Sequence, residues 1–113
     1  MPSKKQIKEH WADWLIDQGK FDTLSELFEA EFCWGCAMEE KTERCHILAR
    51  TFGGSDDVQN LHLLCSDCHK ASELLSGLEY FEWLKRRNVM SRILDVLPAT
   101  VVLDNLKTIG LTP

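Results

Sequence analysis

The sequence predicts a mainly α-helical fold with one small β-hairpin near the middle of the chain. Apolar residues recur at helical spacing before residue 33 and after residue 77, and two short apolar runs flank a turn-forming stretch between them. With 113 residues, 44% of them apolar, the chain can build one modest core. Because no repeat or long Gly/Ser linker interrupts it, we expect a single domain over residues 1–113: N-terminal helices (1–32), a hairpin with its following helix (33–77) and C-terminal helices (78–113).

Two helices are expected in the N-terminal part. Ser3 can cap the first helix, and Gly19 lies just beyond its end. Four apolar residues fall on one face of this helix: Ile7, Trp11, Trp14 and Leu15. The segment Thr23-x-x-Glu26 is typical of a capping box and starts the second helix. The buried stripe of the second helix is expected to be Leu24, Leu27 and Phe28, with Phe32 beyond it.

The remaining elements follow from short apolar runs and from caps. CHILARTF and NLHLLC flank the turn residues GGSDD, which predicts two strands joined by a loop. Ser66 or Asp67 can then cap a helix that runs to Gly77. Amphipathic helices are expected over 78–87, over a segment that ends before Pro98, and from about residue 99 to 110.

The cysteines form two Cys-x-x-Cys pairs, Cys33 with Cys36 and Cys65 with Cys68. The N-terminus lacks an apolar signal region, and no apolar run approaches the roughly 18 residues of a membrane span, so we expect a cytoplasmic protein. A reducing compartment disfavours disulfides, and two such pairs predict one structural Zn²⁺ held by four thiolates. The alternative is buried free thiols or a redox pair.

The formal net charge of −5 argues against a nucleic-acid partner, because phosphate binding depends on lysine and arginine. The distribution of charge weakens this objection. Residues 13–40 hold eight acidic side chains and one lysine, whereas residues 41–92 hold eight basic and seven acidic ones. The half that contains the motifs is therefore nearly neutral, although each basic residue can also be explained as part of a solvated helix face.

Three polar residues accompany the cysteine pairs: His46 in ERCHILAR, Asn60 in QNLHLLC and His69 in CSDCHK. Together with CWGC and the GG turn, they make residues 33–71 resemble the His-Asn-His (HNH) endonucleases of the zinc-clamped type. The resemblance implies a ββα-metal core and the hydrolysis of DNA, most simply double-stranded DNA.

The resemblance also implies a role for each of the three residues. His46 takes the position of the general base, which suits an imidazole that titrates near neutrality. Asn60 takes that of the residue that orients the loop and the base or approaches the metal. His69 takes that of the ligand of a catalytic divalent cation such as Mg²⁺. One position departs from the pattern, because Cys45 stands where many members have a second metal ligand, Asp or His. Cys45 is then interpreted as a small buried residue, and the metal shell must draw on other groups: Glu43, Asp56, Asp57 or substrate oxygens.

The sequence also offers candidates for contact with the nucleic-acid backbone and for packing around the site. The candidates for phosphate contact are basic: Arg44, Arg50, Lys85, Arg86 and Arg87, with Arg92 in the same cluster. His62 is interpreted as a structural or surface histidine, and Trp34 as packing over the zinc site, with stacking on a base as the alternative.

The alternative function is a catalytically silent zinc module that binds nucleic acid or a protein. A third hypothesis is that the chain cuts only within a larger nuclease complex, in which a partner, or a homodimer formed through the C-terminal helices, supplements its small basic surface.

Overall fold

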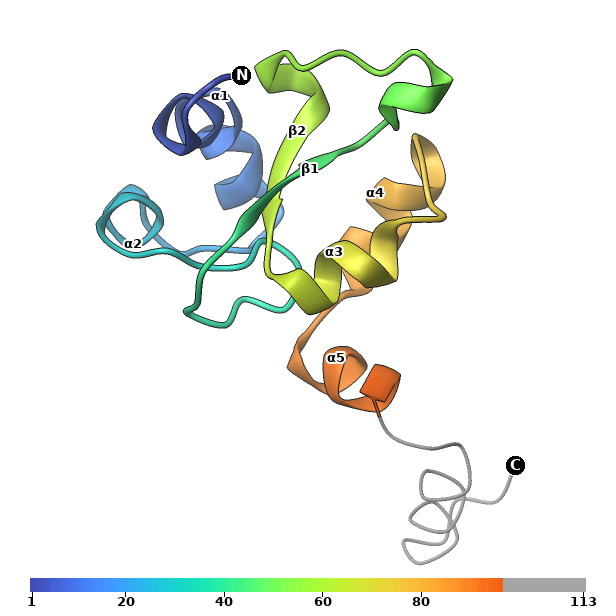
Figure 1. Ribbon diagram of the computed structural model, residues 1–113. Helices are drawn as coiled ribbons and strands as arrows, with labels where there is room; N and C mark the ends of the chain where they lie inside the picture. Colours follow the sequence, from blue (N-terminus) through green and yellow to red (C-terminus); the bar gives the residue numbers. More distant parts are fainter. Residues whose placement is uncertain (97–113) are drawn as a thin grey trace, which may run out of the picture.

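The computed structural model describes residues 1–96 and has two helices, a hairpin and three further helices in that order (Figure 1). The elements are α1 (Lys4–Asp17), α2 (Leu24–Glu29), β1 (Glu43–His46), the 3₁₀ turns η1 (Arg50–Phe52) and η2 (Val58–Asn60), β2 (Leu61–Leu64), α3 (Ser66–Ser72), α4 (Leu78–Arg86) and α5 (Val89–Val96). The predicted mainly α-helical fold with one hairpin is confirmed. The helix expected from about residue 99 to 110 lies outside the described residues. Within residues 1–96, no helix has the length and apolarity needed to cross a bilayer.

The start and end of α1 agree with the sequence. Ser3 Oγ accepts a hydrogen bond from the Gln6 amide at 3.1 Å, and the Gln6 side chain accepts one from the Ser3 amide at 2.8 Å. This reciprocal pair satisfies two amides that the helix itself leaves unpaired. Gly19, just past the end, has a φ of +73°, a conformation that favours glycine. Ile7 and Leu15 are fully buried.

Helix α2 is shorter and less buried than predicted. Thr23 Oγ1 caps it by accepting from the Glu26 amide at 3.2 Å, but the Glu26 carboxylate contacts the amide of Asp22 rather than that of Thr23. Leu27 is buried, whereas Leu24 and Phe28 are exposed. The predicted stripe is wrong at these two positions because α2 has six residues and packs on α1 at the edge of the molecule (Figure 1).

The hairpin is the centre of the fold. Strands β1 and β2 are antiparallel, with Cys45 opposite His62 and His46 opposite Leu61. All four residues of β2 are buried, because both α1 and α3 pack against this strand. Strand β1 ends at His46, so most of the run CHILARTF is loop and 3₁₀ turn rather than strand.

Helix α3 brings one cysteine pair against the hairpin. Its N-cap is Cys65, whose Sγ accepts from the Cys68 amide at 3.5 Å, rather than the predicted Ser66 or Asp67. The helix ends at Ser72, five residues before the predicted end at Gly77. Ser72 Oγ donates to the His69 carbonyl at 2.9 Å, and such bonds back to the preceding turn weaken a helix.

An aromatic cluster around His62 forms the core behind the hairpin. The His62 side chain is fully buried, with ring centroids of Trp11, Trp34 and Tyr80 at 4.4, 5.0 and 5.4 Å. Burial lowers the pKa of His62 to about 3, so the ring is neutral at physiological pH. Tyr80 Oη lies 2.8 Å from Nδ1. The interpretation of His62 as a structural histidine is confirmed, and Trp34 is likewise buried and therefore closed to a nucleobase.

Candidate metal centre and active site

The four cysteines of the two Cys-x-x-Cys pairs meet in one buried cluster. Their sulfur atoms all lie within 4.8 Å of one another, and Cys36 Sγ is 4.0 Å from Cys65 Sγ. Tetrahedral zinc, with Zn–S bonds of about 2.3 Å, places its sulfurs about 3.8 Å apart. The cluster therefore fits a structural metal ion, and the all-thiolate set is the one that Zn²⁺ favours. The predicted convergence of the four cysteines is confirmed.

Each pair sits in a turn that points its sulfurs toward the same space. The Gly35 amide donates to Cys33 Sγ at 3.3 Å, and the Cys68 amide donates to Cys65 Sγ at 3.5 Å. The amide of Trp34 donates to the Leu63 carbonyl at 3.0 Å and so ties the first turn to β2. Thus the first pair is attached to the hairpin, and the second opens α3.

Two thiols of the cluster, those of Cys33 and Cys65, resist ionisation by themselves. A hydrogen bond with Cys68 and burial raise the pKa of the Cys33 thiol, and burial raises that of Cys65 to about 12. Because metal ligands must be thiolates, a cation placed among the sulfurs is what would deprotonate them.

Three basic side chains surround the cluster, and sequence reasoning did not assign them there. Arg87 Nε donates to Cys68 Sγ at 3.2 Å, and Arg92 Nη1 donates to Cys36 Sγ at 3.5 Å. Lys20 Nζ donates to the Gly35 carbonyl at 3.2 Å. Zinc with four thiolates carries two net negative charges, which these cations can balance. No local spacing in the sequence links the three residues to the cysteines.

Arg87 and Arg92 are therefore corrections to the predicted phosphate contacts. The Arg87 side chain is 2% exposed and pairs with Asp95 as well as with the sulfur. Arg92 pairs with both Glu40 and Asp67. Both guanidinium groups already have anionic partners inside the protein, so neither is available to a nucleic-acid backbone.

The second site is a pocket of ≈ 240 Å³ between the end of β1, turn η1 and helix α3. It is lined by Cys45, His46, Ala49, Arg50, Thr51, His69, Ser72, Glu73 and Leu75. The structure thus brings two of the three predicted polar residues, His46 and His69, to one pocket from separate elements.

Each of these imidazoles contacts a carboxylate. His46 Nε2 lies 2.7 Å from Asp56 Oδ1, and His69 Nδ1 lies 2.8 Å from Glu43 Oε1. Arg50 Nη2 is 3.4 Å from the other oxygen of Asp56. Contacts from His46 and Arg50 hold the pKa of the Asp56 carboxyl below its usual range. Both carboxylates were among the candidates for the metal shell, and each of them contacts an imidazole.

Asn60 does not line the pocket but fixes the loop that forms one wall. Its Oδ1 accepts from the Leu48 amide at 2.9 Å, and its Nδ2 donates to the carbonyls of Leu48 and Ser55 at 3.0 and 2.8 Å. A Cβ added at Gly54 would lie 1.8 Å from the Leu48 carbonyl oxygen, so this closed loop requires glycine there. These contacts place Asn60 where it can orient the loop.

Cys45 is a small buried residue, as interpreted from the sequence. Its side chain is almost fully buried with Sγ 3.5 Å from Ser72 Oγ, and burial raises its pKa. A pocket residue that sequence reasoning missed is Glu73, although its spacing of four from His69 on a helix was a usable signal.

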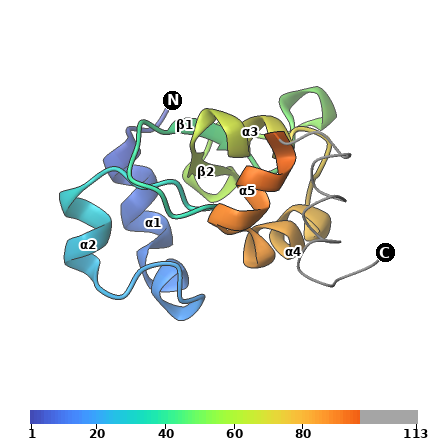
Figure 2. The same ribbon diagram turned by 90° about the horizontal axis from the view of Figure 1, so that it is seen from below.

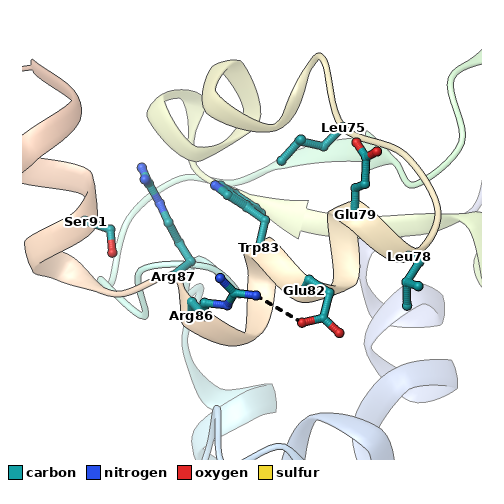
Figure 3. A pocket seen from close by; sticks show the side chains of 8 residues that line it. All are labelled: Leu75, Leu78, Glu79, Glu82, Trp83, Arg86, Arg87 and Ser91. Atoms are coloured by element: carbon teal, nitrogen blue, oxygen red, sulfur yellow. Dashed lines mark hydrogen bonds and ion pairs between the residues drawn. The ribbon is translucent and has the colours of Figure 1, made fainter.

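The other predicted phosphate contacts lie apart from this pocket. Arg44 Nε donates to the Pro2 carbonyl at 2.9 Å, and Arg86 pairs with Glu82 on the exposed face of α4. Arg86 also lines a largely apolar groove of ≈ 500 Å³ along α4 (Figure 3). Of the predicted contacts, Arg50 alone lines the pocket of His46 and His69 within the described part of the chain.

Residues 33–73, a little over a third of the chain, match the family model of the HNH endonuclease. Comparison with curated proteins and with solved structures gave no match. The matched range contains both cysteine pairs, both pocket histidines and Asn60. Residues 33–73 are therefore similar to the HNH endonucleases, and the four cysteines are positioned to hold a metal ion, which is consistent with the zinc-clamped type.

Proposed function

We propose that the protein is a metal-dependent endonuclease that hydrolyses phosphodiester bonds of double-stranded DNA. The observation that carries the proposal is the shared pocket of His46 and His69, which come from β1 and α3 and meet beside Arg50. A structural zinc cluster alone would not require this pair of imidazoles.

His46 acts as the general base in this proposal. Its side chain is 19% exposed, so the ring is reachable by water while its orientation is constrained by the protein. One ring nitrogen contacts Asp56, and the other can accept the proton of a water molecule that attacks phosphorus.

His69 is the protein ligand of the catalytic metal. Because Nδ1 contacts Glu43, Nε2 is the nitrogen left for a cation, an arrangement in which the carboxylate fixes the ring. When bound, Mg²⁺ or a similar ion would stabilise the charge that develops on the phosphate and the leaving oxygen. Glu73, four residues further along and lining the same pocket, can supply an oxygen ligand.

The charge distribution supports a nucleic-acid substrate despite the net charge of −5. The acid-rich segment that contains α2 lies on the opposite side of the hairpin from η1, where Arg50 opens to solvent (Figures 1 and 2). Phosphate can therefore approach the pocket without passing the acidic face. We place this activity in the cytoplasm, where DNA and reduced thiols occur together.

A plasmid assay tests the proposal. Zinc-loaded protein is incubated with supercoiled DNA and Mg²⁺ or Mn²⁺, and relaxed and linear forms are quantified. His46→Ala and His69→Ala should lose cleavage by at least about 100-fold, whereas His10→Ala, an exposed histidine of α1, should cleave as the unchanged protein does. Zinc content and thermal unfolding confirm that each variant is folded. Equal cleavage by His46→Ala would refute the role of His46.

One observation favours the alternative, a catalytically silent zinc module. Cys45 stands at the position of a metal ligand in many family members, but its sulfur is buried against Ser72. If the protein shifts labelled DNA in a gel but leaves it intact with every divalent metal, the binding module is the better description.

A further inference from the structure

We propose that Asp56 is the positioning residue of His46: it holds the proton on Nε2 and thereby makes Nδ1 the nitrogen that accepts the proton of the attacking water. This inference rests on the proposed nuclease function, but the part that concerns the ring can be measured without activity. The motif pattern does not assign Asp56 this role, because its carboxylate was only one of several candidates for the metal shell.

The geometry of the contact fixes the tautomer. His46 Nε2 and Asp56 Oδ1 are 2.7 Å apart, and an ionised carboxylate can only accept a hydrogen bond. The proton must therefore sit on Nε2, and a neutral imidazole carries only one ring proton. Nδ1 then bears the lone pair, as a general base requires.

The carboxylate of Asp56 is itself held from two directions. Arg50 Nη2 lies 3.4 Å from Oδ2, so each oxygen atom of the carboxylate has a partner. Asn60 Nδ2 donates to the carbonyl of Ser55, the residue directly before Asp56, at 2.8 Å. By closing this loop, Asn60 helps to position the Asp56 carboxylate beside the His46 imidazole. Asn60 therefore influences the orientation of His46 without contacting it.

The two pocket histidines are fixed in opposite ways. The Asp56 carboxylate contacts Nε2 of His46, whereas the Glu43 carboxylate contacts Nδ1 of His69. The free nitrogens are thus Nδ1 on the proposed base and Nε2 on the proposed metal ligand. The two carboxylates, which lie on different elements, thus leave different ring nitrogens free on two identical side chains. This difference suits one imidazole to proton transfer and the other to metal binding.

The next residue provides a matched control. Asp57 is exposed, and its carboxylate contacts Gln59 Nε2 at 3.4 Å rather than an imidazole. Asp57→Ala removes the same carboxylate as Asp56→Ala, one position away in the same loop. Any effect of general loop charge should therefore appear in both variants.

The first test is nitrogen NMR of the histidine rings in zinc-loaded protein without Mg²⁺. We expect His46 to be protonated on Nε2 in the unchanged protein and in Asp57→Ala, and to show a mixture of both tautomers in Asp56→Ala. Protonation of His46 on Nδ1 in the unchanged protein, or an unaltered tautomer in Asp56→Ala, would overturn the proposal.

The second test is steady-state cleavage of a DNA duplex, together with Mn²⁺ titration by calorimetry. Asp56→Ala should lower kcat by about 10–100-fold, part of what a general base contributes, with KM and Mn²⁺ affinity unchanged. A loss of Mn²⁺ affinity without a change of tautomer would instead make Asp56 a metal ligand and refute its positioning role. Absence of cleavage by the unchanged protein would refute the proposed function and the base role of Nδ1, while the ring nitrogens would still decide whether Asp56 sets the tautomer.

Discussion

Replacing Arg87 by methionine should weaken zinc binding although every cysteine ligand remains. Arg87 lies at the end of α4, 19 residues from Cys68 along the chain, and its Nε donates to Cys68 Sγ at 3.2 Å. Its guanidinium also pairs with Asp95 and stacks on Trp83 at 5.3 Å from the ring centroid. Methionine keeps most of the length and apolar contact of the side chain but removes both the donor and the charge.

The magnitude follows from the single contact to sulfur. A hydrogen bond to a charged acceptor contributes about 1.5–3 kcal/mol, which corresponds to roughly 10–150-fold in an equilibrium constant. Loss of a partner that contacts a metal ligand typically costs about 10–100-fold in metal affinity. We therefore expect the dissociation constant of zinc to rise by about 10–100-fold, with a further loss of stability because α5 is no longer tied to α4 through Asp95.

Competition with a coloured zinc chelator measures this change directly. The matched control is Arg86→Met on the neighbouring residue, whose side chain is exposed and pairs only with Glu82 in the described part of the chain. Circular dichroism of the zinc-loaded variants shows whether each is folded. If Arg87→Met retains zinc as tightly as Arg86→Met, the contact at 3.2 Å contributes nothing and the charge-balancing role is wrong.

Three further predictions concern stability. Tyr80→Phe should cost about 1–2 kcal/mol because the buried Nδ1 of His62 loses its partner; denaturant unfolding that matches the unchanged protein would contradict this. Ser3→Ala should cost about 1 kcal/mol through loss of the cap, measured as a fall in the midpoint of thermal unfolding. Hydrogen bonds from the Lys4 ammonium and from the amide and hydroxyl of Thr42 lower the pKa of Glu31 from 4.5 to about 2, so this stabilisation is present above pH 4.5 and is lost as the pH falls toward 2. Glu31→Gln should therefore flatten the pH dependence of unfolding free energy in that range, and an unchanged slope would show that the pair does not stabilise the fold.

Features with a local physical cause could be predicted from the sequence. The cap at Ser3, the glycine at residue 19 and the turn within each Cys-x-x-Cys pair depend on a few neighbouring residues. Helix starts have specific chemistry, because a side-chain oxygen must replace a missing backbone partner. The end of α3 was harder to predict, since the bond from Ser72 Oγ to the His69 carbonyl competes with the helix in a way that apolar spacing does not reveal.

Features that depend on distant residues could not be predicted. The run CHILARTF has the composition of a strand, but the chain turns after His46 because Asn60 bonds both polar backbone groups of Leu48, twelve residues away. In the sequence, Arg87 is part of a basic cluster. Its contact with Cys68 Sγ becomes visible only in the packing of α4. In the same way, the sequence offered acidic candidates for the metal shell but could not tell which of them contact imidazoles.

Helix α3 contributes one side chain to the cysteine cluster and the next to the pocket, so the two sites are structurally connected. Cys68 and His69 are adjacent in this helix, so their side chains point about 100° apart, one into the cluster and the other toward the pocket. The first cysteine pair is tied to β2 through the Leu63 carbonyl, and β2 carries β1 with His46 at its end. A metal ion shared by the two pairs would therefore fix α3 relative to the hairpin and, with it, the separation of the two imidazoles. The remaining links between β1 and α3, from Glu43 to His69 and from Cys45 to Ser72, involve a half-exposed ion pair and one weak sulfur contact. Such contacts contribute little by themselves, so we expect the relative placement of the two imidazoles to depend chiefly on the cysteine cluster once it holds a metal ion.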